Sequence, residues 1–184
     1  MSVTPPVRSG GEQRRPGKEL VPAARIRERV RELALEIDRD HSGQPVHLVC
    51  VLKGAFVFLA DLIRALRTPL TLDFLAVSSY ADRSTTSGEV RLLKDLDYGL
   101  EGRAVVIVED IVDTGLTLRY LQETLRARGP RSLRTASLLS KPSRRLVEVP
   151  VDYIGFEIED RFVVGYGLDY AGRYRELSGV AVLE

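Results

Sequence analysis

The segment VVIVEDIVDTGLTL, residues 105–118, constrains the fold of this chain more than any other stretch. It begins with an apolar, β-branched run that is typical of a strand buried on both faces of a sheet. Two adjacent acids, Glu109 and Asp110, end that run. A third acid, Asp113, precedes a small polar turn and a helical pattern of leucines. A strand that passes directly into a turn and a helix is the building block of an α/β fold.

The rest of the chain repeats this alternation of strands and helices. We expect helices over 21–41, 55–66 and 114–129, and strands at 46–52, 71–77, 90–93, 103–108, 133–139, 151–156 and 162–166. Such an order predicts an α/β domain with a mostly parallel central sheet flanked by helices. Because ligands bind at the carboxyl edge of such sheets, a site is expected where 53–54 and 109–117 meet.

Length and composition restrict the class of protein. The 184 residues favour one folded domain at 19–184, preceded by a flexible tail at 1–18. A net charge of +1 gives no broad field for a nucleic acid, and no stretch reaches the ~20 apolar residues that span a membrane. The N-terminus lacks the apolar segment of a signal peptide, and the one cysteine, Cys50, is expected as a buried structural thiol. We therefore expect a cytoplasmic protein without nucleic-acid or membrane partners.

The turn after the acids predicts an anion site. Residues 114–117 lie at the start of a helix, where backbone N–H groups lack partners within the helix and the helix dipole attracts negative charge. Thr114 and Thr117 add hydroxyl donors, and Gly115 leaves the backbone open to a phosphate. The chain contains neither GxxxxGK[ST] nor GxGxxG, so neither a P-loop nor a dinucleotide fingerprint is indicated.

The acids before that turn suit hydroxyl groups. Glu109 and Asp110 can accept hydrogen bonds from a vicinal diol such as the 2- and 3-hydroxyls of ribose, and Asp113 can accept a proton. A sugar 5-phosphate satisfies both halves of the segment. The alternative, solvated acids before an ordinary helix start, would explain an isolated D-T-G but does not account for the whole string.

The segment resembles the ribose-5-phosphate signature of the type I phosphoribosyltransferases, specifically the hypoxanthine-guanine phosphoribosyltransferases. The resemblance extends from about Glu19 to the C-terminus, and includes VCVLKGAFVFLADL, SSYADRSTTSGEV, LLSKPSRR and VDYIGFEIEDRFVVGYGLDYAGRYREL. It implies the Rossmann-like fold of that family, with a small hood built from the chain termini. It also implies purine salvage, in which ribose 5-phosphate passes from phosphoribosyl pyrophosphate (PRPP) to N9 of hypoxanthine or guanine. The products are IMP or GMP and pyrophosphate, and Mg²⁺ is required.

The resemblance assigns the segment's residues to PRPP. It implies that Glu109 and Asp110 hold the ribose hydroxyls and magnesium, and that Asp113 lies near purine N7 as the catalytic acid-base group. The 5-phosphate loop comprises Thr114, Gly115, Leu116 and Thr117. The family often has a lysine where this chain has Leu116. Because the phosphate contact is largely made by the main chain, we expect this change to be tolerated.

One turn and two more residues are assigned to pyrophosphate and metal by the same resemblance. Lys53 and Gly54 match the pyrophosphate loop, where a non-proline cis peptide is typical. Arg175 matches an arginine that binds pyrophosphate, and its guanidinium fork suits paired oxygens. Asp169 matches a magnesium ligand. Without the family, Lys53-Gly54 reads as a strand end and the segment around Asp169 and Arg175 reads as a polar loop.

The base site is implied by three residues. Lys141 matches the lysine that donates to the purine O6, and an ammonium, which only donates, favours a 6-oxo group over the 6-amino group of adenine. Phe162 matches the aromatic residue that stacks on the purine, and Val163 matches one that contacts the base edge through its backbone. The alternatives are a solvated lysine and a core phenylalanine.

The remaining expectations concern a loop, two arginines and the assembly. Ser79 and Tyr80 match a mobile lid within the polar segment 78–89, and Arg144 and Arg145 read as solvated charge. The family implies a homo-oligomer, a dimer or a tetramer. Two other functions remain open: a transferase that prefers xanthine or guanine, and a non-catalytic regulator that senses PRPP on the same fold.

Overall fold

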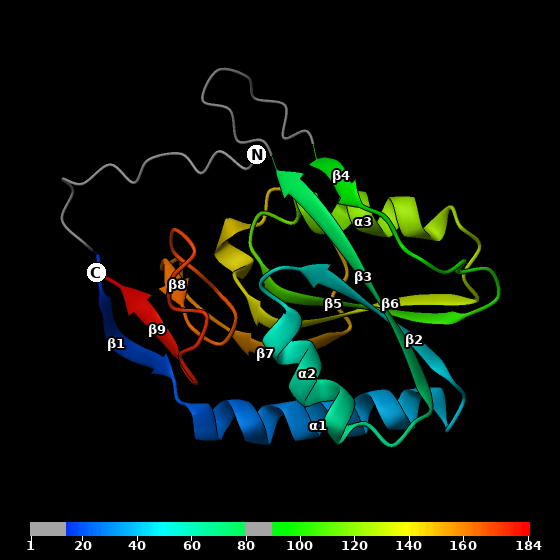
Figure 1. Cartoon of the computed structure of the whole chain (residues 1–184), viewed down its shortest axis with the longest axis horizontal. Helices are drawn as coiled ribbons and strands as arrows, with labels where there is room; N and C mark the ends of the chain where they lie inside the picture. Colours follow the sequence, from blue (N-terminus) through cyan, green and yellow to red (C-terminus); the bar gives the residue numbers. More distant parts are fainter. Residues whose placement is uncertain (1–13, 80–89) are drawn as a thin grey trace, which may run out of the picture.

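The computed structural model describes residues 14–79 and 90–184 (Figure 1). Its main sheet has six strands in the order β4-β3-β2-β5-β6-β7. All neighbouring pairs are parallel except β3 and β4, so the carboxyl ends of β2, β5 and β6 lie at one edge. The bounds are β2 Val46–Leu52, β3 Leu70–Ser79, β4 Val90–Lys94, β5 Ala104–Val112, β6 Ser132–Ser140 and β7 Tyr153–Glu157.

Helices cover both faces of this sheet, as the alternation of elements predicted. In Figure 1, α1 (Ala23–His41) and α2 (Phe56–Ala65) lie on one face and α3 (Leu116–Arg126) lies on the other. Strand β5 contributes to the core on both faces of the sheet, because its side chains point alternately to one face and the other. Val106 and Val108 pack with α1 and α2, whereas Val105 and Ile107 pack with α3. The predicted burial of this strand on both faces of the sheet is confirmed.

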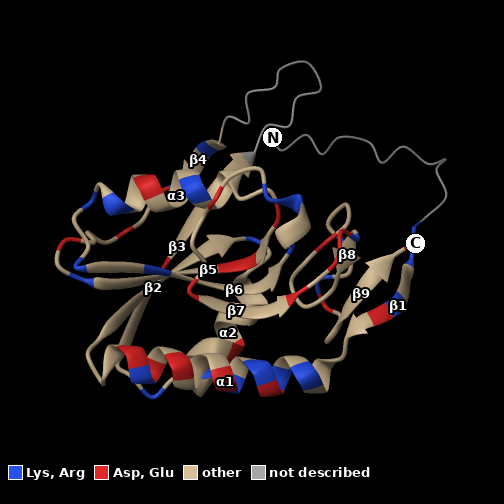
Figure 2. Ribbon diagram, turned by 180° about the vertical axis from the view of Figure 1, so that it is seen from behind, with Lys and Arg blue, Asp and Glu red and all other residues tan. Residues whose placement is uncertain are grey.

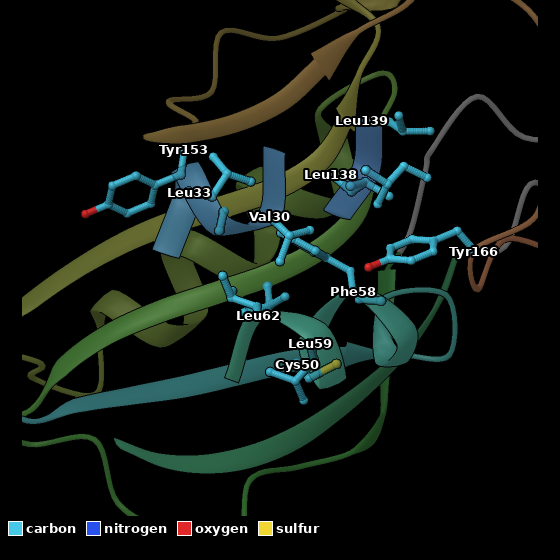
Figure 3. Close-up of a cluster of buried hydrophobic side chains, with 14 of the residues drawn as sticks. Val30, Leu33, Cys50, Phe58, Leu59, Leu62, Leu138, Leu139, Tyr153 and Tyr166 are labelled. Atoms are coloured by element: carbon cyan, nitrogen blue, oxygen red, sulfur yellow. The ribbon is translucent and has the colours of Figure 1, made fainter. Parts of the chain in front are cut away.

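The layer formed with α1 and α2 holds the larger part of the core (Figure 3). Cys50 on β2 lies within it and is completely buried, close to Leu59 and Leu62 of α2. Burial raises the pKa of the Cys50 thiol to about 12, which keeps it protonated and unreactive at neutral pH. The expected buried structural thiol is therefore confirmed.

A second, antiparallel sheet of three strands forms the hood. Its order is β1-β9-β8, with bounds β1 Pro16–Val21, β8 Val163–Val164 and β9 Val180–Leu183. The N-terminal and C-terminal segments thus pair with each other, as the resemblance implied. Two expectations were wrong: residues 16–18 belong to β1 rather than to a tail, and the strand expected at 162–166 has two residues and joins the hood, not the main sheet.

Contacts between the hood and α2 fix the hood over the carboxyl edge of the main sheet. The Tyr166 hydroxyl donates to Asp61 of α2 at 2.6 Å. Gly167 has a φ of +99°, and a Cβ at this position would overlap the carbonyl oxygen of Gly54. Only glycine combines this backbone conformation with so close an approach. The loop after β8 therefore rests directly on the turn between β2 and α2.

We expect Gly167→Ala to lower the free energy of unfolding by about 2–4 kcal/mol, since it adds backbone strain to overpacking. Gly172→Ala is the matched control, because Gly172 has a φ of +81° but a Cβ added there would meet nothing within 4 Å. The control should lose only about 1–2 kcal/mol in urea unfolding. Equal losses in the two variants would show that the contact with Gly54 does not constrain the hood.

The structure also bears on membrane association. Within residues 14–79 and 90–184, no helix is long and apolar enough to cross a membrane.

Candidate active site

A cleft of about 280 Å³ opens where the carboxyl edge of the main sheet meets the hood. It collects residues from the β2–α2 turn, the end of β5, the end of β6, strand β8 and the loop that precedes β9. Nine residues singled out from the sequence line it: Lys53, Gly54, Asp110, Asp113, Lys141, Phe162, Val163, Asp169 and Arg175. A larger hollow of about 650 Å³ lies between β1 and β7, but none of these residues lines it.

The acids at 109–110 lie inside strand β5, not after it. The expected strand ended at Val108, whereas β5 continues to Val112 because the backbone of Glu109 and Ile111 still pairs with β6. Consecutive strand residues point to opposite faces, so the two carboxylates diverge. Asp110 lines the cleft and lies against Gly54, where a Cβ would overlap its carboxylate. Glu109 is buried and is not among the residues that line the cleft.

Burial gives both carboxyl groups unusual acid–base properties. Desolvation raises the pKa of Glu109 well above its usual range, and the neighbouring charge of Asp110 raises it further. Desolvation also raises the pKa of Asp110 to about 6, although the Ile111 N–H and the positive charge of Arg175 oppose the shift. Figure 2 shows the acidic residues at the end of β5 and in the loops near β8. A ligand that brings a cation or hydroxyl donors to this edge would relieve the desolvation cost.

The turn at the start of α3 is formed around Gly115. Gly115 precedes the helix with a φ of +87° and offers no side-chain cap. Thr114 Oγ1 accepts a long hydrogen bond of 3.4 Å from the Leu116 N–H. Gly115 also packs against Val147 and Val149, where a Cβ would lie 3.0–3.2 Å from their side chains. Glycine is therefore required at this turn by its conformation and by packing.

The opposite wall of the cleft carries the groups expected to bind pyrophosphate. The peptide bond between Leu52 and Lys53 is cis, as the resemblance implied for this turn. Arg175 donates to the Gly167 carbonyl at 2.6 Å and pairs with Asp169 at 2.5 Å. Asp169 also accepts from the Gly172 N–H at 2.7 Å. These contacts hold Arg175 and Asp169 in the loop that covers the Lys53-Gly54 turn.

The residues expected at the base site differ from their alternative interpretations. Only 8% of the Lys141 side chain is exposed, so it is not a solvated lysine, and its ammonium lies 3.7 Å from Asp160. Phe162 is 52% exposed, which rules out the core alternative, and its ring meets that of Tyr170 edge-on at 5.8 Å. Val163 is buried in β8 beside it. An exposed aromatic ring at the mouth of a polar cleft is available to stack on a flat ligand.

Two arginines next to this site were interpreted wrongly from the sequence. Arg144 donates to the Asp113 carboxylate at 3.1 Å, and Arg145 donates to the carbonyls of Val112 and Asp113 and to Ser140. Neither is merely solvated charge. Both follow Lys141 in or just after the short helix η1 (Pro142–Arg144), which lies beside the end of β5. Asp160, which pairs with Lys141 and Arg144, carried no signal in the sequence.

The expected lid is only partly described. Ser79 is the last residue of β3 and pairs with Val90 of β4, so the polar segment begins after it rather than at Ser78. Tyr80 lies outside the described residues.

Comparison with known proteins places the cleft in a family. The family model of the phosphoribosyl transferase domain matches residues 17–171. The hypoxanthine-guanine phosphoribosyltransferase of Bacillus subtilis is 47% identical over 167 residues, which cover 91% of this chain and 93% of that protein. The hypoxanthine phosphoribosyltransferase of Salmonella typhimurium is 48% identical over 163 residues, or 88% and 92% of the two chains.

A solved structure agrees with these relatives. The crystal structure of a hypoxanthine-guanine phosphoribosyltransferase from Bacillus anthracis superimposes with a TM-score of 0.89 at 44% identity, and covers 92% of this chain and 100% of its own. A shared fold alone does not require so much identity over so much of both chains. The chain therefore belongs to the phosphoribosyltransferase family, among its hypoxanthine-guanine members.

Proposed function

We propose that the chain transfers ribose 5-phosphate from PRPP to N9 of hypoxanthine or guanine in purine salvage. The observation that carries this proposal is the cleft at the carboxyl edge of β5. It joins a buried carboxylate, an arginine and a buried lysine, and the start of α3 follows closely after Asp113, which lines its wall. Each group suits a different part of a phosphoribosylated purine.

The ribose and its phosphate suit the strand end. Asp110 accepts from the ribose hydroxyls, and backbone N–H groups of 114–117 donate to the 5-phosphate. Lys53, Gly54 and Arg175 bind the pyrophosphate on the opposite wall. In the reaction, the bond from C1 to pyrophosphate breaks and its electron pair leaves with pyrophosphate. Positive charge then develops on the ribose ring, close to the carboxylates of β5.

The base suits the wall formed by β6, η1 and β8. Phe162 stacks on the purine, Val163 meets its edge through the backbone, and Lys141 donates to O6. The lone pair of N9 then forms the new bond to C1. Asp113 accepts the proton that the purine must lose at N7, so that a neutral nucleotide base results.

The donor set suits magnesium. Asp110 and Asp169 line one cleft, and Mg²⁺ typically takes one or two carboxylates together with phosphate oxygens and water. In the part of the chain that the structure describes, no group of three or more His, Cys, Asp or Glu residues forms a metal cage. Asp110 and Asp169 would hold the ion jointly with the ligand. When bound, it would neutralise charge on the leaving pyrophosphate.

Membership of this family also suggests the substrates, the cellular compartment and the oligomeric state of the enzyme. The reaction uses PRPP and a 6-oxopurine, both small cytoplasmic metabolites, and we propose a cytoplasmic homo-oligomer, a dimer or a tetramer. No nucleic acid or membrane takes part. Sedimentation of the full chain would test the assembly.

An assay with PRPP, Mg²⁺ and each of four bases tests the proposed function. We expect hypoxanthine and guanine to give IMP and GMP, xanthine to react weakly and adenine not to react; EDTA should abolish turnover. A preference for xanthine would assign the chain to the sibling transferase. Tight binding of PRPP without turnover of any base would indicate a regulator.

Phe162→Ala tests the stacking role. We expect the KM for hypoxanthine to rise about 10-fold, since stacking of a base on an aromatic ring contributes about 1–3 kcal/mol. Stability should change little, because half of the Phe162 side chain is exposed. Tyr98→Ala is a control with a similarly exposed ring, 57%, outside the residues that line the cleft. An unchanged KM in Phe162→Ala would remove this residue from base binding.

A further inference from the structure

Four charged side chains form a chain of alternating sign beside the cleft. Arg144 Nε lies 3.1 Å from Asp113 Oδ1, and Arg144 Nη1 lies 3.6 Å from Asp160 Oδ2. The other carboxylate oxygen of Asp160 lies 3.7 Å from Lys141 Nζ. Arg144 thus binds two acids and Asp160 binds two cations. The order of charges along the chain is negative, positive, negative, positive.

The two ends of this chain line the cleft, whereas its two middle members are not among the lining residues. Asp113 and Lys141 face the cleft from the ends of β5 and β6. Arg144 lies one turn of η1 after Lys141, and its N–H donates to the Lys141 carbonyl at 3.1 Å. Asp160 comes from the segment before β8. The middle pair therefore ties the two ends together from outside the cleft.

We propose that Arg144 and Asp160 are positioning residues that fix the spacing between Lys141 and Asp113. This inference rests on the proposed function, in which Lys141 donates a hydrogen bond to O6 and Asp113 accepts the proton of N7. These two atoms lie on one edge of a 6-oxopurine, so one rigid donor–acceptor pair can recognise both at once. Arg144 and Asp160 set that pair before the base arrives, and thereby set the preference for 6-oxopurines.

The physical basis is preorganisation, not stability. The side chains of Arg144, Asp113 and Asp160 are 48%, 41% and 54% exposed, and ion pairs at that exposure add little to folding. Positioning is different, because an error of about 1 Å at a reacting group can cost about 100-fold in rate. Asp160 restricts the rotamers of Lys141, and Arg144 restricts those of Asp113, before the base binds. The base then does not have to order these side chains when it binds.

Arg144→Gln and Asp160→Asn test the proposal. We expect each to raise the KM for hypoxanthine about 10-fold or more while the KM for PRPP stays within about twofold, because residues elsewhere in the cleft hold PRPP. Discrimination against adenine should fall, most strongly in Asp160→Asn, which frees Lys141. The unfolding temperature should stay within about 2 °C of that of the wild type.

Arg161→Gln and Glu159→Gln are matched controls. They remove the same charges one residue away from Asp160. The Arg161 and Glu159 side chains form an ion pair with each other at 4.0 Å. Both should retain wild-type kinetics. Arg144→Lys keeps the charge without the fork that reaches two acids, so it should restore only part of the affinity for the base.

A double-mutant cycle separates positioning from a general electrostatic effect. If Arg144 acts through Asp113, Arg144→Gln should raise the KM for hypoxanthine little further in the Asp113→Asn background. Multiplicative effects would overturn the proposal, as would wild-type selectivity in both Arg144→Gln and Asp160→Asn. A higher kcat/KM in Arg144→Gln would also overturn it, since Arg144 would then hold Asp113 away from the base. Failure of the proposed function looks different: the wild type itself would turn over none of the four bases.

Discussion

Asp113→Asn is expected to reduce kcat for hypoxanthine by about 10²–10³-fold, in the range of general acid–base catalysis. The amide has the same shape as the carboxylate but cannot take the purine N7 proton. Asp113 is 41% exposed and its hydrogen bond from Arg144 can be accepted by an amide oxygen, so the fold should be unaffected. Steady-state kinetics and thermal unfolding of the same preparation would separate the two effects.

Asp97→Asn is the control for this substitution, because Asp97 is 70% exposed and is not among the residues that line the cleft. It should leave kcat unchanged. If Asp113→Asn kept more than about a third of the wild-type kcat, proton transfer to Asp113 would not be part of the rate-limiting chemistry.

Asp110→Asn is expected to stabilise the protein while it removes activity. The folded-state pKa of Asp110, about 6, exceeds the ordinary value near 3.9, so the folded state binds the proton more tightly than the unfolded chain does. That contribution to stability is fully present below the ordinary pKa and is lost as the pH rises through 6. At pH 7.5 the ionised carboxylate therefore costs on the order of 2 kcal/mol, which the neutral amide does not.

We expect the unfolding temperature of Asp110→Asn to rise by about 4–8 °C at pH 7.5, and the difference from the wild type to vanish near pH 4. In the same variant, kcat/KM for PRPP should fall by about 10²–10³-fold, because a group that faces developing positive charge is lost. Thermal unfolding across this pH range and initial rates at varied PRPP would measure both changes.

Asp95→Asn supplies a control of opposite sign. Hydrogen bonds from Arg128 lower the pKa of Asp95, so its carboxylate contributes stability above its ordinary pKa that is lost on acidification. Asp95→Asn should therefore lower the unfolding temperature slightly at pH 7.5. A destabilised Asp110→Asn at pH 7.5 would contradict the claim that burial of this carboxylate is unfavourable without a ligand.

Much of the main sheet could be predicted because its strands carry their own signal. The apolar run at 46–52 and the leucines at 118, 121 and 125 have a period that only one kind of element satisfies. The same reasoning ended β5 at Val108, since the acids that follow do not look like a strand. The backbone of Glu109 pairs with β6 whatever its side chain is, and side-chain pattern does not report that pairing.

Part of the site could also be predicted from the strands. The features that were missed, the hood strands and the contacts of Arg144 and Asp160, depend on segments that are distant in the sequence. Parallel strands bring their carboxyl ends together, so the strand pattern placed 53–54 and 109–117 at one edge. Lys141, Asp169 and Arg175 were assigned only through the resemblance to the family. The hood strands are short, and residues 16–21 pair with 180–183. A local sequence pattern does not indicate a pairing partner that is so distant in the chain. The contacts of Arg144 and Asp160 could not be predicted for the same reason, because they depend on η1 and the loop before β8 lying beside β5.

A crystal structure of the protein with bound GMP would test the central claim most directly. The account predicts the phosphate on the backbone of 114–117, the ribose hydroxyls beside Asp110, and the base between Phe162 and Lys141. A nucleotide seated elsewhere, for example in the 650 Å³ hollow between β1 and β7, with an empty β5–α3 junction, would contradict it.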